Sequence, residues 1–156
     1  MKFKIKRSKL DIITEIGCLV CLFGLLIYFV LNWGGFPDEI PGHYNAAGEI
    51  DRWGSKTELF ILPVVSWVLY AFLSLLERFP QIWNTGVAIT EENRERVYRT
   101  LKNMVQLLKL SMVIFFVIMS YMQSTAQSIS GWLILFFMII FFGILTSYLV
   151  KLYQRR

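Results

Sequence analysis

The stretch from Leu110 to Val150 reads LSMVIFFVIMSYMQSTAQSISGWLILFFMIIFFGILTSYLV, and none of its 41 residues is charged. About 20 apolar helical residues cross the ~30 Å hydrocarbon core of a bilayer, so the stretch is long enough for two crossings. Its middle, from Gln123 to Gly131, is polar and rich in small residues. Lipid offers an irregular backbone no hydrogen-bond partners, so this turn belongs at the membrane surface. The stretch predicts two spans, near residues 104–123 and 132–150.

Two further runs without charge precede it. The run from Ile16 to Pro37 has 22 residues, and the run from Leu59 to Leu76 has 18. They predict spans near residues 12–32 and 58–76. A cleaved signal peptide is the alternative for the first run, because the preceding residues are basic. However, its apolar part is long for a signal core and no small-residue cleavage site follows directly, so we expect it to be retained.

The composition agrees with this pattern. The chain is 56% hydrophobic and only 17% charged, whereas soluble domains average about a quarter charged. The net charge of +5 does not indicate nucleic-acid binding, because the basic residues flank apolar runs and form no patch among exposed aromatics. We predict an all-α membrane protein with four transmembrane helices, folded as a single membrane domain over residues 1–156.

Basic residues are distributed unequally between the two predicted faces of the membrane. Of the 16 lysines and arginines, only Arg52 and Lys56 fall in the loop of residues 33–57. The other 14 include Lys109 at the start of the third span, from where we expect its side chain to reach the headgroups. Because lysine and arginine concentrate on the cytoplasmic side, both termini are predicted to be cytoplasmic and the loop of residues 33–57 to lie outside.

Residues 77–103 form the predicted cytoplasmic loop and an amphipathic helix. Val97, Leu101, Met104 and Leu108 recur at helical spacing, and we expect this helix to continue into the third span. Glu95 and Arg99 are a potential i,i+4 ion pair. No charge falls at the centre of any predicted span, which argues against proton pumps and ion-coupled transporters.

The outer loop, residues 33–57, contains the chain's single histidine, His43. A turn is predicted at Asn45–Gly48, with Gly48 free to adopt a positive φ. His43 and Asp51 are candidates for a divalent metal site or for an acid–base pair, with Glu39 or Glu49 as further carboxylates. We favour the simpler expectation that both residues hydrogen-bond to the loop backbone and hold its shape, or contact a partner. The loop has no nucleophile motif.

The segment PDEIPGHYNAAGEIDRWGSK, residues 37–56, resembles the signature P-x-x-I-P-x-H-[FY]-N-x-x-G-x-x-D-x-W-G-S-K of a bacterial membrane domain of unknown function. That domain occurs in SdpI-type immunity proteins and in many small relatives. The segment ITEENRERVYRTLKNMVQLLKL, residues 89–110, is similar to the region that follows in such proteins. The resemblance covers roughly residues 15–125. SdpI-type proteins protect a producing cell from its own secreted peptide toxin, and some relay its presence to a regulator.

The resemblance implies a multi-pass protein of the bacterial cytoplasmic membrane, embedded in the lipid bilayer. It favours a binding or sensing module that meets a secreted peptide or a membrane protein partner. The motif residues predicted to bind are His43, Asn45, Gly48, Asp51, Trp53 and Lys56. No cofactor is expected, although a divalent metal at His43 and Asp51 is left open. The alternatives are a membrane enzyme that uses these two residues and an accessory subunit of a larger membrane complex.

Overall fold

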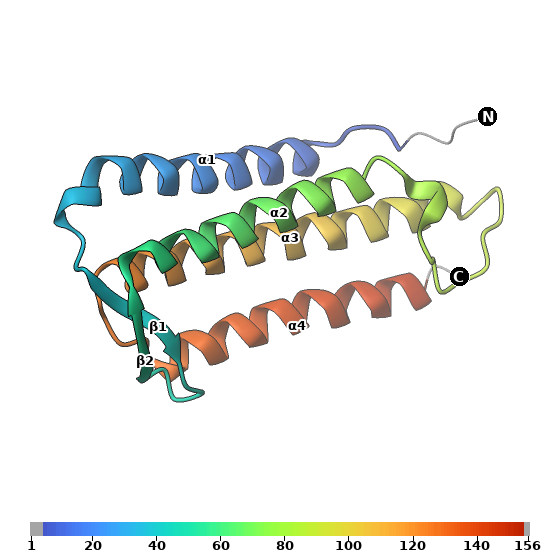
Figure 1. Ribbon diagram of the computed structural model, residues 1–156. Coiled ribbons are helices and arrows are strands. Elements are labelled where there is room, and N and C mark those ends of the chain that lie inside the picture. Colours follow the sequence, from blue (N-terminus) through green and yellow to red (C-terminus); the bar gives the residue numbers. More distant parts are fainter. Residues whose placement is uncertain (1–4, 155–156) are drawn as a thin grey trace.

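Four long helices lie side by side in the computed structural model, which describes residues 5–154 (Figure 1). They are α1 (Lys9–Asn32), α2 (Ile61–Leu76), α3 (Arg94–Ser124) and α4 (Gly131–Tyr153). Within the described residues, four helices are long and apolar enough to cross a membrane. This confirms the predicted number of helices and identifies a multi-pass membrane protein.

Helix α3 is the centre of the bundle, because it packs against each of the other three helices. It runs for 31 residues without a break. The amphipathic segment and the predicted third span are therefore one helix. Helix α1 begins at the end of the bundle where α4 finishes, as Figure 1 shows. The connection between α2 and α3, which includes the short 3₁₀ helix η3 (Pro80–Ile82), lies at the same end.

A β-hairpin occupies the opposite end and departs from the all-helical prediction. Strands β1 (Glu39–Tyr44) and β2 (Ile50–Ser55) are antiparallel, with Glu39 opposite Ser55 and Tyr44 opposite Ile50. Irregular pairing around His43 marks a bulge. The strands were missed because each has six residues and contains glycine, and one contains proline, which single-sequence patterns associate with loops. The predicted turn at Asn45–Gly48 joins them.

The hairpin is held on the helices by a buried apolar cluster. Ile40 of β1 and Leu59 of the 3₁₀ helix η2 (Lys56–Phe60) are both completely buried. They pack with Leu25 and Phe29 of α1 and with Phe36. Burying a large apolar side chain stabilises a fold by about 1.5–3 kcal/mol relative to leaving it exposed. The hairpin is therefore part of the folded core.

Polar contacts fix the tip of the hairpin to the turn between α3 and α4. The Ile129 N–H donates to the Gly48 carbonyl at 2.9 Å. The Tyr44 hydroxyl donates to the Gln127 carbonyl at 3.1 Å, and the Gln123 Nε2 donates to the Pro41 carbonyl at 2.8 Å. These bonds replace water as the partner of backbone groups at the bundle end.

Gly48 contacts the α3–α4 turn so closely that a side chain at this position would not fit. Its φ is +84°, and an added Cβ would overlap the Ile129 carbonyl oxygen. We predict that Gly48→Ala lowers the midpoint of thermal unfolding and makes the hairpin cleavable by protease. The matched control is Gly86→Ala, because Gly86 also has a positive φ, +66°, but open space around it. The control carries only the left-handed backbone cost of about 1–2 kcal/mol. Equal effects of the two substitutions would contradict the docking.

Candidate functional site

His43 and Asp51, the two residues predicted to carry chemistry, meet on the hairpin surface. The His43 Nδ1 lies 2.7 Å from the Asp51 Oδ1. Both side chains are open to solvent, with exposed fractions of 64% for His43 and 43% for Asp51. A carboxylate at one ring nitrogen orients an imidazole and leaves its other nitrogen free for a ligand or a proton. The pair therefore has the geometry of an oriented histidine.

Asn45, Gly48 and Lys56 support the hairpin. The Asn45 Oδ1 accepts from the N–H groups of Ala47 and Glu49, at 2.9 and 3.0 Å. Gly48 bonds to the α3–α4 turn. The Lys56 Nζ donates to the Phe36 carbonyl at 2.9 Å and lies 5.0 Å from the centre of the Trp33 ring. These three residues give the segment its shape.

Trp53 and Arg52 present further chemistry on β2. Trp53 is half exposed, which gives the hairpin a large apolar surface beside its polar pair. Arg52 donates to the Gly42 carbonyl at 2.7 Å and to the Glu58 Oε2 at 2.8 Å. The hydrogen bond to Glu58, together with its charge, raises the pKa of Arg52. Arg52 thus clamps the two strands to the start of the second span.

A cavity of about 270 Å³ lies beneath the hairpin. His43, Tyr44 and Glu58 line it from one side, and Gln123 and Ile134 line it from α3 and α4. Burial raises the pKa of Tyr44 to about 12, so its hydroxyl remains a donor at neutral pH. The Gln123 Oε1 is buried and has no hydrogen-bond partner among the described residues. The cavity therefore combines an apolar lining with one unused acceptor.

No three His, Cys, Asp or Glu side chains within residues 5–154 gather in a group that could hold a metal ion. The divalent metal at His43 and Asp51 stays a prediction.

A second set of charged residues lies at the other end of the bundle, and the sequence did not reveal it. We call it the ion cluster: Asp11, Glu15, Glu77, Arg99, Lys102 and Lys109. Lys109 of α3 is 1% exposed. Its Nζ contacts the Glu15 Oε2 of α1 at 3.1 Å and the Glu77 Oε1 at 2.7 Å. It also donates to the Ser74 Oγ at 3.0 Å. One ammonium group therefore joins α1, α2 and α3.

Asp11 is the other centre of the ion cluster. It is 4% exposed. Its carboxylate oxygens form ion pairs with the Arg99 guanidinium at 3.0 Å and with the Lys102 Nζ at 2.7 Å. Arg99 therefore pairs with a carboxylate 88 positions away in the chain, whereas the sequence pattern pairs it with Glu95. The Tyr70 hydroxyl donates to Glu15. Within the ion cluster, three carboxylates balance three cations.

One prediction about charge is wrong. Lys109 does not reach toward the headgroups but lies buried between helices, paired with Glu15 and Glu77. The physical reason is pairing: a charge is expensive in a low-dielectric interior unless an opposite charge and hydrogen bonds accompany it. The signal available in the sequence was an acid just inside the first predicted span and a base just inside the third, which become partners only when helix packing is known.

Comparison with known proteins gives a partial match. Residues 19–67 match a family described as a domain of unknown function, DUF1648. That segment contains the last part of α1, the whole hairpin and the beginning of α2. The chain is 35% identical over 74 residues to an uncharacterized protein of Archaeoglobus fulgidus, which covers 42% of this chain and 40% of that protein. The chain therefore spans less than half the length of this relative. No solved structure matches.

We predict that Lys109→Met destabilises the protein by about 3 kcal/mol, because it leaves two partly buried carboxylates, 31% and 11% exposed, without their cation. The triple variant Lys109→Met, Glu15→Gln, Glu77→Gln removes the charges together, so we expect it to recover much of that loss. The free energy of unfolding in mild detergent measures both. A triple variant less stable than Lys109→Met would show that the carboxylates do not depend on Lys109.

Proposed function

We propose that this protein is an SdpI-like membrane binding module of the bacterial cytoplasmic membrane. Its hairpin faces outward and recognises a secreted peptide or the exposed part of a membrane protein partner. The motif of residues 37–56 supports this proposal, as does the match of residues 19–67 to DUF1648. Orientation rests on the basic residues, because 14 of the 16 lie away from the hairpin loop.

The observation that carries the proposal is that the motif residues fall into two groups, one that holds the shape of the hairpin and one that is exposed to solvent. Asn45 shapes the hairpin turn, and Gly48 and Lys56 bond to backbone groups outside the hairpin. His43, Asp51 and Trp53 point their functional groups toward solvent. Affinity rises when a surface is ordered before binding, because less conformational entropy is lost. The hairpin is such a surface.

The exposed groups suit a polypeptide ligand. Tryptophan is enriched among the residues that dominate binding energy at protein interfaces. The His43–Asp51 pair beside it supplies a polar contact, and a two-stranded sheet offers backbone groups at its edges to an added strand. These features favour an extended peptide over a small soluble ion.

Helix α3 connects the proposed recognition surface to the opposite end of the bundle. Gln123 near its end bonds to β1, whereas Arg99 near its start and Lys109 at its middle belong to the ion cluster. A ligand that shifts the hairpin would act on a helix whose other end is fixed by ion pairs. This arrangement supports a role in immunity or in signalling the presence of the peptide.

A photo-crosslinking amino acid in place of Trp53 tests the proposal directly. In intact cells given culture supernatant that contains the secreted peptide, we expect a covalent product with that peptide. The matched control places the same amino acid at Val64, which is similarly exposed but on α2. Adding Asp51→Asn should reduce the product several-fold by freeing His43. Equal products at positions 53 and 64 would reject recognition by the hairpin.

The 2.7 Å contact between His43 and Asp51 also supports a second candidate, a metal-dependent or acid–base enzyme. For this candidate, the purified protein should contain about one equivalent of divalent metal, and His43→Ala and Asp51→Ala should each lose it. Elemental analysis of the three proteins measures their metal content and so tests the metal-dependent enzyme. Thermal unfolding of the same proteins is the control for folding. Folded protein without metal in all three cases leaves the hairpin as a recognition surface.

A further inference from the structure

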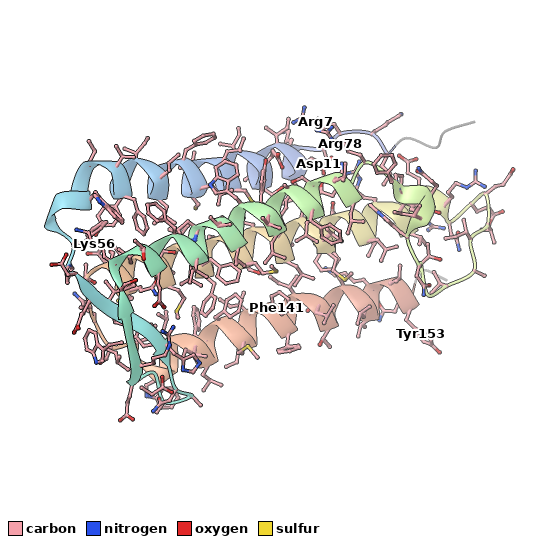
Figure 2. All side chains as sticks on the ribbon, viewed as in Figure 1. Arg7, Asp11, Lys56, Arg78, Phe141 and Tyr153 are labelled. Carbon is pink, nitrogen blue, oxygen red and sulfur yellow. The ribbon has the colours of Figure 1, made fainter. Side chains whose placement is uncertain are left out.

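A polar cavity of about 180 Å³ lies at the end of the bundle away from the hairpin. Its lining includes Arg7 before α1, Arg78 after α2 and Gln106 of α3, together with the three carboxylates of the ion cluster. Figure 2 labels Arg7, Arg78 and Asp11 close together where α1 begins and α2 ends. Nothing in the proposed function of the hairpin uses this cavity.

Three cations (Arg7, Arg78 and Lys102) and three carboxylates line the cavity, but the carboxylates are already engaged by ion pairs. Asp11 is paired with Arg99 and Lys102, and Lys109 is paired with both other carboxylates. The ion cluster is therefore neutral by itself. Arg7 and Arg78 are exposed, and neither makes an ion pair or a side-chain hydrogen bond within residues 5–154. The charge of Arg7 acts on Glu15 without a direct contact, so both guanidinium groups at the rim keep their N–H donors unused among the described residues, which favours an anionic ligand.

Phosphate is the anion that fits two arginines. A guanidinium presents parallel N–H donors that match two phosphate oxygens. Basic pockets between transmembrane helices on the cytoplasmic side are recognised sites for phospholipid headgroups. The cavity is placed for this role, because it opens where the apolar helices meet the basic segments.

Gln106 adds a second requirement. It is 2% exposed, and its Nε2 donates to the Glu77 Oε2 at 3.0 Å. Its Oε1 is buried without a hydrogen-bond partner among the described residues. A buried acceptor without a donor is costly, and a ligand hydroxyl next to the phosphate would supply that donor.

We propose that the cavity binds a phosphate ester that carries a free hydroxyl, of the glycerophosphate type. Arg7 and Arg78 hold the phosphate at the rim, and Gln106 accepts from the hydroxyl inside. The same group is present in the headgroup of phosphatidylglycerol and in free glycerol phosphate. Bound headgroup would tie the start of α1 to the end of α2.

Native mass spectrometry of the full chain in detergent, with equimolar phosphatidylglycerol and phosphatidylcholine, tests this site. We expect one phosphatidylglycerol to be retained in preference. Arg7→Gln with Arg78→Gln should reduce its retention at least about tenfold, because both charge-assisted contacts are lost. The control, Arg96→Gln with Lys151→Gln, removes two exposed charges from the same end but outside the cavity, so retention should change less than about twofold. Equal losses in the two double variants would overturn the proposal, as would equal retention of both lipids.

Two further measurements test the hydroxyl and the source of the phosphate. The wild type should prefer phosphatidylglycerol to phosphatidic acid, and Gln106→Leu should abolish this preference while anionic lipid is still retained. An unchanged preference in folded Gln106→Leu overturns the role of Gln106. Displacement of lipid by millimolar sn-glycerol 3-phosphate would identify the soluble ester as the ligand. Failure to displace a retained lipid would identify the headgroup.

Discussion

The buried ammonium of Lys109 is the contact on which the helix arrangement depends. It meets carboxylates of α1 and of the segment after α2, so three helices are fixed by one side chain. In lipid, apolar side chains provide little drive for helices to associate, because the hydrocarbon tails are as apolar as leucine. Most apolar residues on α4 face outward. Polar pairing therefore helps to define how α1, α2 and α3 face one another.

The hairpin end is stabilised differently. There, Ile40 and Leu59 are buried among aromatic side chains of α1, and backbone groups of the tip bond to the α3–α4 turn. This end resembles the core of a soluble domain in its buried apolar cluster and in the hydrogen-bonded backbone groups of its tip. The bundle thus has an ionic end and a packed end, and α3 passes through both. A displacement at either end would have to be accommodated along a single continuous helix.

Four helices could be predicted from the sequence because an uncharged apolar run of about 20 residues is typical of a transmembrane helix. The hairpin could not, since its pattern is short and includes Gly42, Gly54 and Pro41, although Asn45 and Gly48 did indicate its turn. The His43–Asp51 contact was one of several pairings that the loop allowed. The ion pairs of the ion cluster could not be predicted from the sequence, because the paired residues lie up to 94 positions apart in the chain. Local pairing rules assigned Arg99 to a neighbour on its own helix, and tertiary packing overrode them.

The match to DUF1648 separates the hairpin from the ion cluster. It begins at residue 19 and ends at residue 67, so it contains the hairpin with the helix segments beneath it and none of the ion cluster. The Gln123 and Ile129 contacts that dock the hairpin also lie outside it. The buried cluster that holds the hairpin on the helices lies entirely within the matched segment, whereas the tip of the hairpin is docked by α3 and the α3–α4 turn. The base of the hairpin is therefore anchored within the matched segment, and its tip is anchored by the part of this chain that follows the segment.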